Sequence, residues 1–212
     1  MIDLHTHTLL SDGALLPSEL VRRAWVKGYE GIAITDHVDP SNIDFVLPRI
    51  VKVSKILSSR WPIKVLPGVE ITHAPLEEIE GLIRYSRRNG AKIVVIHGET
   101  VSEPVLPGTN RRAIECKADI LAHPGLLTKQ DAQLAREKGV YVEITTRANH
   151  SKTNQHVRDL ARETGFNLVL NTDSHDPDDL IDDAKRVSFL QALGFKEEEI
   201  ERIIRNAALF SN

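Results

Sequence analysis

The feature that most constrains this chain is a repeated alternation between short apolar runs and longer stretches with helical spacing. The apolar runs are rich in β-branched residues and begin about 20–32 residues apart, the size of a strand–helix unit with a right-handed crossover. Seven runs are expected to be strands, at Ile2–Leu4, Gly31–Thr35, Ile63–Leu66, Lys92–Ile96, Asp119–Ala122, Val140–Thr145 and Leu168–Asn171. Five stretches between them are expected to be helices, at Ser18–Lys27, Ile43–Ser58, Leu76–Arg88, Lys129–Lys138 and Asn154–Thr164.

The character of these runs favours a closed barrel. They are continuously apolar rather than alternating, which indicates strands that are covered on both faces. Seven units without a long linker therefore predict an α/β fold, a distorted TIM-like (βα)7 barrel. The residues after Asp176 are expected to add C-terminal helices against the outside of the barrel, so that residues 1–212 form a single domain. Several helices are expected to end at a left-handed glycine, at Gly28, Gly90, Gly139 and Gly165.

The composition restricts the function classes only broadly. With 41% hydrophobic and 27% charged residues and a net charge of −3, the chain is expected to be a soluble globular protein without general attraction for nucleic acid. No apolar run reaches the roughly 18–20 residues that cross a bilayer, and no signal peptide is expected. The single cysteine, Cys116, excludes an internal disulfide, so we expect a cytoplasmic protein.

Histidines and carboxylates follow the expected strands. The opening stretch "MIDLHTHTLLSDG" places His5 and His7 on the same face of the first strand, because side chains alternate along a strand. In a barrel of parallel strands, the C-terminal strand ends meet at one rim. We therefore expect a cluster at that rim that also contains His37, Glu70, His97, His123, Asp173 and His175.

Each of these residues alone has an ordinary explanation, such as a loop histidine or, for Asp173, a helix cap. The repetition of the pattern at the ends of several separate strands favours a metal site instead. Imidazoles and carboxylates without a thiolate suit zinc, manganese or iron. The set exceeds the four ligands of a structural zinc site, so more than one ion is expected.

The ordered motifs "DLHTHTLLSDG", "AITDH", "PGVE", "VVIHGE", "LAHPG" and "NTDSH" resemble those of the PHP family, named for polymerase and histidinol phosphatase domains. The resemblance covers almost the whole chain and implies a distorted seven-stranded barrel with two or three divalent ions at its C-terminal rim. The ligand positions that it implies are His5, His7, Asp12, His37, Glu70, His97, His123, Asp173 and His175.

The resemblance also implies how these ligands are shared. Glu70 should bridge two ions, of which one is held by His5, His7 and Asp173 and the other by His97 and His123. The third ion should be held by Asp12, His37 and His175.

The implied activity is that of a metal-dependent phosphoesterase similar to histidinol phosphatase. We expect a metal-bound hydroxide to attack a small phosphomonoester, because metals lower the pKa of bound water from about 15.7 toward about 7. Glu70 and Asp173 are then catalytic members of the metal site. The expected partner is a small phosphorylated substrate, with no membrane and no extended nucleic acid.

The residues expected to contact the substrate lie near the same rim. Arg147 is expected to bind phosphate oxygens through two N–H groups. His73 is expected to protonate the leaving group, with His150 as a similar candidate, and Glu143 to orient a ligand histidine. The stretch "ETVSEPVLPGTN", Glu99–Asn110, is expected to be an ordered active-site loop.

Other polar residues receive ordinary interpretations. Lys152 and His156 lie in the same segment as Arg147 and His150. Arg111 and Arg112 are expected to lie on a solvated helix face, and Cys116 to be a small core residue.

Three other functions fit parts of the pattern. A metal-dependent amidohydrolase shares the first-strand histidines, but Asp12, His37 and the Asp173–His175 pair exceed its needs, and it usually has eight strands. A nuclease or nucleotide phosphoesterase of the PHP family fits the ligands, although the overall charge disfavours a long nucleic acid. A non-catalytic metal-binding domain would need fewer ligands.

Overall fold

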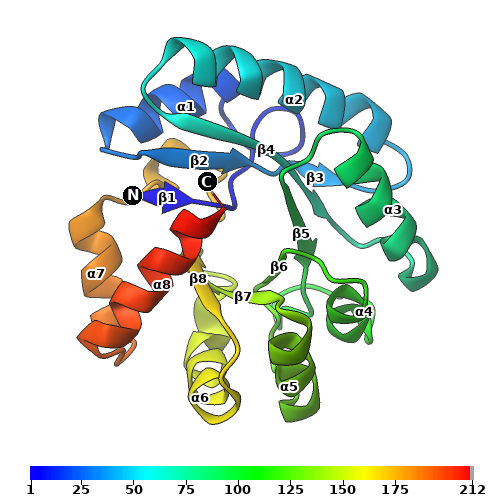
Figure 1. The fold of residues 1–212 in the computed structure, drawn as a ribbon, viewed down its shortest axis with the longest axis vertical. Helices are drawn as coiled ribbons and strands as arrows, with labels where there is room; N and C mark the ends of the chain where they lie inside the picture. Colours follow the sequence, from blue (N-terminus) through cyan, green and yellow to red (C-terminus); the bar gives the residue numbers. More distant parts are fainter. Residues whose placement is uncertain (211–212) are drawn as a thin grey trace.

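The computed structural model describes residues 1–210, and it shows parallel strands in a ring with helices on the outside (Figure 1). The strands follow the order β1-β2-β4-β5-β6-β7-β8 with β3 paired to β4, and these pairings are parallel. The predicted α/β, TIM-like barrel of seven strand positions is therefore confirmed. The strands are β1 Ile2–Asp3, β2 Gly31–Ile34, β3 His37–Val38, β4 Lys64–Ile71, β5 Ile93–His97, β6 Ile120–Ala122, β7 Tyr141–Thr145 and β8 Leu168–Asn171.

The helices agree closely with those expected, and three of them have the predicted bounds. They are α1 Pro17–Val26, α2 Ile43–Arg60, α3 Leu76–Arg88, α4 Thr109–Glu115, α5 Lys129–Lys138, α6 Asn154–Thr164, α7 Asp183–Ala192 and α8 Glu197–Leu209. Two short 3-10 turns, η1 Ser151–Thr153 and η2 Pro177–Asp179, lie in loops. The predicted left-handed glycines have φ values between 71° and 99° at Gly28, Gly90, Gly139 and Gly165.

The second strand position is split, which the sequence did not predict. β2 pairs with the first part of β4, and β3 pairs with its last part, where His37 faces Glu70. Between the two pieces, Asp36 accepts hydrogen bonds from the backbone and hydroxyl of Thr8 and from Ser11. These bonds hold Asp36 to the loop after β1, and the short, polar β3 has no apolar run that would reveal it.

β1 and β8 close the barrel incompletely. They share one isolated bridge, between Thr6 and Ser174, in place of a full ladder. Side chains complete the seam: the backbone of Leu4 donates to Asn171 Oδ1 at 2.9 Å. Asp3 accepts from the hydroxyl of Thr172 at 2.6 Å. The seam between β1 and β8 is therefore closed by these side-chain bonds together with two backbone bonds, from Asp173 to His5 and from His7 to Ser174.

α8 packs against β8 and β1, beside this seam (Figure 1). The C-terminal helices were expected to lie outside the barrel, but Ala207 in the last turns of α8 belongs to the inner apolar cluster. The ring of Phe210 also meets that of Tyr141, with centroids 5.0 Å apart. The end of α8 therefore covers the end of the barrel where the strands begin.

Two apolar clusters fill the molecule, one inside the ring and one between the ring and the helices. β5 shows how the sequence divides between them, because Ile93 and Val95 belong to the inner cluster whereas Val94 and Ile96 belong to the outer one. His97 continues the inward series at the C-terminal end of this strand. The same alternation of inward and outward side chains along β5 therefore directs His97 into the mouth of the barrel.

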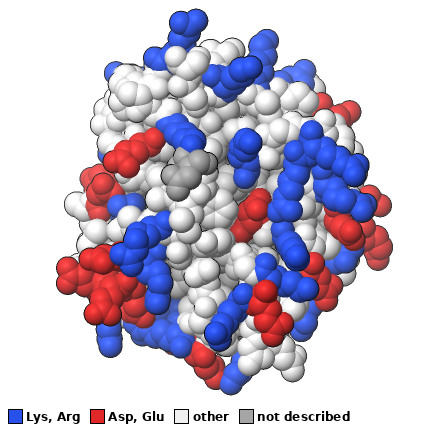
Figure 2. Space-filling view, in the orientation of Figure 1, with Lys and Arg blue, Asp and Glu red and all other residues white. Residues whose placement is uncertain are grey.

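The helix ends distribute charge unevenly over the molecule. Each helix from α1 to α6 carries a cation in its last turn, at Arg23, Arg60, Arg87, Arg88, Arg112, Arg136, Lys138 and Arg162. Such cations stabilise the negative end of the helix dipole, and in this topology the ends lie where strands begin. The face in view in Figure 2 accordingly carries many Lys and Arg side chains. Within residues 1–210, no helix combines the length and apolar character needed to cross a membrane.

Candidate metal centre

The structure brings the predicted ligand residues together at the C-terminal mouth of the barrel. Most of them are buried, whereas Asp12 is exposed and His37 is half-buried. A cleft of about 360 Å³ opens over them, and its wall includes Arg147, Glu103 and His150. The scattered strand ends of the sequence therefore form one site, as expected for this topology.

Glu70 lies at the centre of the site. Its Oε2 is 3.3 Å from Nε2 of His5 and 3.5 Å from Nε2 of His7, and its Oε1 is 3.5 Å from Nε2 of His123. Asp173 approaches from the other side, with Oδ1 3.2 Å from Nε2 of His7. The Glu70 carboxylate therefore faces His5 and His7 with one oxygen and His123 with the other.

These separations differ from those of hydrogen bonds. An N–H···O bond has a heavy-atom distance near about 2.9 Å. Two ligands of a tetrahedral zinc ion, each at about 2.0–2.1 Å from the metal, lie about 3.3 Å apart. The observed distances of 3.2–3.5 Å match this second geometry.

Unpaired polar atoms support the same interpretation. Buried polar atoms are normally hydrogen-bonded, yet several here have no such partner among the described residues. They include Nε2 of His5, both ring nitrogens of His7, Oε1 of Glu70 and Oδ1 of Asp173. The donor set therefore fits divalent cations, which would satisfy these atoms.

A second group surrounds Asp12. Its Oδ1 lies 3.2 Å from Nε2 of His175 and 3.5 Å from Nε2 of His37. The other ring nitrogens are engaged elsewhere. Nδ1 of His37 lies 2.7 Å from both the Thr72 hydroxyl and Oε2 of Glu70, and Nδ1 of His175 donates to the carbonyl of Asp173 at 2.9 Å. Both Nε2 atoms are thereby directed at Asp12, as the resemblance implied for a third ion.

Glu103 is a site residue that the sequence analysis missed. It lies in the loop between β5 and α4, and its carboxylate reaches His97, His73 and His150 at 3.2, 3.4 and 3.4 Å. The loop itself was expected to be an ordered active-site loop. Which of its two glutamates faces the cleft depends on the path of the loop, which no local pattern specifies.

Glu143 orients His5 from behind. Nδ1 of His5 donates to Oε2 of Glu143 at 2.7 Å, and Nδ2 of Asn171 donates to the same oxygen at 2.8 Å. With its proton fixed on Nδ1, His5 presents the lone pair of Nε2 to Glu70. This contact is the one expected for Glu143.

Burial and neighbouring charges set the protonation states. Burial lowers the pKa of His7 to about 3, and the nearby His37 adds to this effect, so its imidazole is neutral. Burial alone would raise the pKa values of Glu70 and Asp173, but facing histidines, His5 first among them, hold both well below their usual range.

Burial alone would lower the pKa values of His5, His37 and His123, but the facing carboxylates, Glu143 for His5 and Glu70 for the other two, raise them above their usual range. Because metal ions bind neutral imidazoles and ionised carboxylates, a cation at these three histidines would displace protons.

Strained backbone is concentrated at this mouth. Four non-glycine residues in 1–210 have positive φ, and three of them are His73 at 51°, His123 at 25° and Asp173 at 52°. This region of φ is costly for residues with a Cβ and persists where the surroundings impose it. The fold therefore holds these side chains in positions that a relaxed loop would not adopt.

Arg147 lies on the cleft wall as predicted. Its Nη1 donates to the carbonyl of Asp173 at 3.3 Å and to Oδ2 of Asp179 at 3.4 Å. The same side chain borders an adjoining cavity of about 620 Å³ that is also lined by Ile181 and Phe189. Its guanidinium is thus held between two hollows, one polar and one partly apolar.

The remaining candidates lie outside the site. Nε2 of His156 donates to the carbonyl of Leu127, and Lys152 is exposed on η1. Arg111 and Arg112 differ from the solvated face that was expected, because they pair with Asp131 and Glu80 and so connect α4 to its neighbours. Cys116 packs half-buried against the outer cluster.

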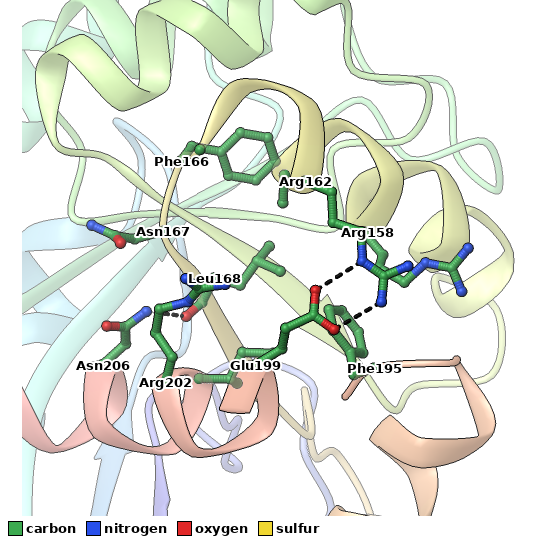
Figure 3. A pocket seen from close by; sticks show the side chains of 12 residues that line it. Arg158, Arg162, Phe166, Asn167, Leu168, Phe195, Glu199, Arg202 and Asn206 are labelled. Atoms are coloured by element: carbon green, nitrogen blue, oxygen red, sulfur yellow. Dashed lines mark hydrogen bonds and ion pairs between the residues drawn. The ribbon is translucent and has the colours of Figure 1, made fainter. Parts of the chain in front are cut away.

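A separate cavity of about 330 Å³ lies between α6 and α8 (Figure 3). Arg158, Arg162 and Arg202 line it together with Phe166 and Phe195. Arg162 crosses it to Glu199 through two hydrogen bonds of 2.8 Å. This cavity borders Leu168, the first residue of β8, and so lies at the opposite end of the strand from the histidines.

Sequence comparison agrees with this geometry. A family model described as the PHP domain matches residues 3–106. A protein of Methanocaldococcus jannaschii, described as uncharacterized, is 47% identical over 201 residues, which cover 93% of this chain and 92% of that protein. The chain belongs to the PHP domain family.

Other PHP-like proteins differ in their described roles. Ribonuclease P protein component 3 of Methanosarcina mazei is 29% identical over 204 residues, covering 89% of this chain and 79% of that protein. The histidinol phosphate phosphatase of Lactococcus lactis, solved with zinc, L-histidinol and phosphate, has a TM-score of 0.64 at 19% identity. The comparison covers 92% of this chain and 94% of that one, and it supports the barrel fold.

Proposed function

We propose that this PHP-family protein is a metal-dependent phosphoesterase that hydrolyses a small phosphomonoester, in the manner of a histidinol phosphatase. The observation that carries this proposal is the spacing of 3.2–3.7 Å between the imidazole nitrogens of His5 and His7 and the carboxylate oxygens of Glu70 and Asp173. The cleft of about 360 Å³ above them suits a small ligand.

The nine predicted ligands are assigned to two or three divalent cations. His5, His7 and Asp173 would hold one cation, and His97 and His123 a second, with Glu70 between them. Asp12, His37 and His175 would hold a third. Zinc, manganese and iron all fit this set of imidazoles and carboxylates. Such cations lower the pKa of bound water and offset the charge of a phosphate group.

The residues of the chain position both the cations and the substrate. Glu70 and Asp173, buried and ionised, keep the donor groups at a fixed separation. Arg147 would donate to the oxygens of the phosphate that do not bridge to the leaving group. Its existing bonds to Asp179 and to the Asp173 carbonyl orient the guanidinium before the substrate arrives.

The leaving group needs a proton when the phosphoester bond breaks. We assign this proton to Nε2 of His73, which lies 3.4 Å from Oε2 of Glu103 at the edge of the site. Glu103 would hold the imidazole in place. His73 can fill this role while Nε2 binds no metal.

The test is the release of inorganic phosphate by metal-free protein that has been reloaded separately with Mn²⁺, Zn²⁺ or Fe²⁺. The substrates are histidinol phosphate, simple sugar phosphates, nucleoside mono- and bisphosphates, and short 5′-phosphorylated oligonucleotides. Strong metal-dependent release from one of them is the expected result. The absence of release with every metal would contradict the proposal and favour an amidohydrolase or a diester-cleaving nuclease.

Two variants separate the proposed centre from the rest of the chain. Asp173→Asn and His37→Ala should reduce release to background while the barrel remains folded by circular dichroism. Lys152→Ala, on the exposed surface of η1, should leave the activity unchanged. Near-normal activity in Asp173→Asn would rule out the assigned ligands.

A nuclease or nucleotide phosphoesterase is the second candidate. It is favoured by the similarity to ribonuclease P protein component 3, a protein named for RNA processing. The oligonucleotides and nucleotides in the panel test it directly, because cleavage of an internal diester would produce shorter chains without free phosphate.

A further inference from the structure

The loop between β5 and α4 builds a second donor cluster beside the predicted ligands. We propose that His73, His97 and Glu103 form an additional divalent-cation position at the outer rim of the cleft, which we call the outer position. Two of these residues, His73 and Glu103, lie outside the nine positions that the PHP resemblance implies. The inference rests on the proposed function, since it extends the metal centre of the same barrel.

The distances around Glu103 have the geometry of shared ligation. Its Oε2 lies 3.2 Å from Nε2 of His97 and 3.4 Å from Nε2 of His73, and its Oε1 lies 3.4 Å from Nε2 of His150. These values are close to the 3.3 and 3.5 Å that separate His5 and His7 from Glu70, and they exceed the usual hydrogen-bond length of about 2.9 Å. Two ligands of one zinc ion are expected about 3.3 Å apart.

His97 is the buried member of this cluster and is held with Nε2 toward Glu103. It is 3% exposed, and its Nδ1 has no hydrogen-bond partner among the described residues. His150 is 6% exposed and borders the cluster, with its Nδ1 2.8 Å from the hydroxyl of Thr100. It groups with His97 and His123 rather than with His73.

The outer position takes His97 from the nine implied ligands. Among the described residues, the carboxylate within 4.0 Å of a His97 ring nitrogen is that of Glu103, whereas His123 faces Glu70. Because one Nε2 binds one cation, a filled outer position leaves His123 and Glu70 to the second inner cation. Two imidazoles and one carboxylate make a three-ligand set suited to zinc or a similar borderline cation, with a fourth position open to water or substrate. Glu103 and His73 have side chains 38% and 42% exposed, so the position opens to solvent.

The fold holds Glu103 in place from both sides of the loop. Oε1 of Glu99 accepts from the backbone of Gly108 at 3.0 Å and of Asn110 at 2.8 Å. The hydroxyl of Ser102 donates to the carbonyl of Asn149, next to His150. The loop is therefore fastened around Glu103, which reduces the entropy lost on binding a cation.

Cation binding at the outer position excludes one proposed role. A ligated Nε2 of His73 carries no proton, so His73 cannot protonate the leaving group while a cation is bound there. Occupancy of the outer position would thus change the charge beside the leaving group and replace an acid by a cation.

The experiment counts metal ions. Metal-free protein is equilibrated with buffered Zn²⁺ and the bound zinc is measured by mass spectrometry for wild type, Glu103→Gln, His73→Asn and Asp173→Asn. His73→Asn is chosen because asparagine tolerates the positive φ at this residue. Glu77→Gln, an exposed glutamate in the first turn of α3, is the matched control.

Glu103→Gln and His73→Asn should each bind one zinc fewer than wild type, or bind the weakest zinc at least about 10-fold more weakly. Glu77→Gln should match wild type. An unchanged zinc count and affinity in Glu103→Gln would overturn the outer position, and a loss in Asp173→Asn would then leave the proposed function intact. Loss in Glu103→Gln with no change in Asp173→Asn would instead support the outer position and contradict the inner ligands.

Discussion

At the scale of single residues, the ligand histidines depend on partners that never touch a substrate. His5 is held by Glu143, His175 by the Asp173 carbonyl, and His37 lies against the Thr72 hydroxyl. Each contact occupies Nδ1 and leaves Nε2 for the centre of the site. The tautomers are therefore set by neighbours from other strands and loops.

Glu143→Gln tests this arrangement. The carboxylate of Glu143 accepts hydrogen bonds from both His5 and Asn171. In glutamine one of the two oxygens is replaced by an NH2 group, which is itself a donor and so faces the N–H group of His5 or Asn171 unfavourably. We expect zinc affinity to fall by about 10–100-fold while the protein stays folded. A competition titration against a chelator measures it, with Glu77→Gln as the control. Unchanged affinity would show that Glu143 does not orient His5.

Gly125 shows a different constraint, that of backbone approach. Its φ is +63°, and an added Cβ would lie 1.9 Å from the carbonyl oxygen of Glu99. Gly139 has a similar φ of +71° but nothing within 4 Å of such a Cβ. Gly139→Ala is therefore expected to cost about 1–2 kcal/mol from φ alone. Gly125→Ala should cost clearly more and displace the loop that carries Glu103.

Urea denaturation of both variants measures the difference in unfolding free energy. Equal losses would mean that the loop moves away from residue 125 without cost.

At the scale of secondary-structure elements, loops and helix ends complete the two ends of the barrel. The loop between β5 and α4 adds Glu103 to the site, and α8 covers the opposite end of the barrel. α8 is tied to α6 by Arg162, which donates to both carboxylate oxygens of Glu199 at 2.8 Å (Figure 3). This pair crosses the cavity between the two helices.

The pH dependence of stability tests this pair. The hydrogen bond from Arg162 lowers the pKa of Glu199 to about 2, against about 4.3 in an unfolded chain. A lowered folded pKa means that the stabilisation is complete above about pH 4.3 and is lost as the pH falls toward 2. Because Arg162 is 38% exposed, we expect less than about 1 kcal/mol.

Glu199→Gln should remove that part of the acid dependence in urea titrations between pH 5 and about 2.5. Glu201→Gln, which breaks only an ion pair with Arg205 within α8, should retain it. The same acid dependence in Glu199→Gln and wild type would show that the pair between the helices contributes nothing.

At the scale of the whole molecule, the barrel gathers acidic groups that are unfavourable together without cations. Glu70, Asp173 and Glu143 are buried at the mouth, and each retains an oxygen without a hydrogen-bond partner in the described residues. Divalent cations would balance this charge only in the folded state, because the ligands are far apart in sequence. Metal binding should therefore stabilise the fold.

Removal of metal by a chelator tests this coupling. At a free concentration of 100 times Kd, one site adds about 2.7 kcal/mol, which corresponds to roughly 5–10 °C in Tm for a chain of this size. The thermal shift between metal-loaded and metal-free protein should be at least this large in wild type and clearly smaller in Asp173→Asn. The same shift in both proteins would place the stabilising cation elsewhere.

The repeating pattern of strands and helices, and the chemistry at the strand ends, follow from the amino-acid sequence alone. Periodicity and apolar runs are local properties, so they sufficed to predict the parallel barrel and most helices, including the bounds of α3, α5 and α6. The alternation along β5 that buries Ile93 and Val95 also directed His97 inward. Where a side chain's direction follows from strand geometry, its place in the site could be predicted.

The directions of other side chains depend on segments that are distant in the sequence, so they are visible only in the folded protein. Glu103 lies in a loop without a repeating pattern, and its path is set by bonds from Glu99 to the start of α4 and from Ser102 to Asn149. The split between β2 and β3 and the entry of α8 into the inner cluster have the same cause. Each depends on contacts between segments far apart in the chain, and such contacts leave no local signature in the sequence.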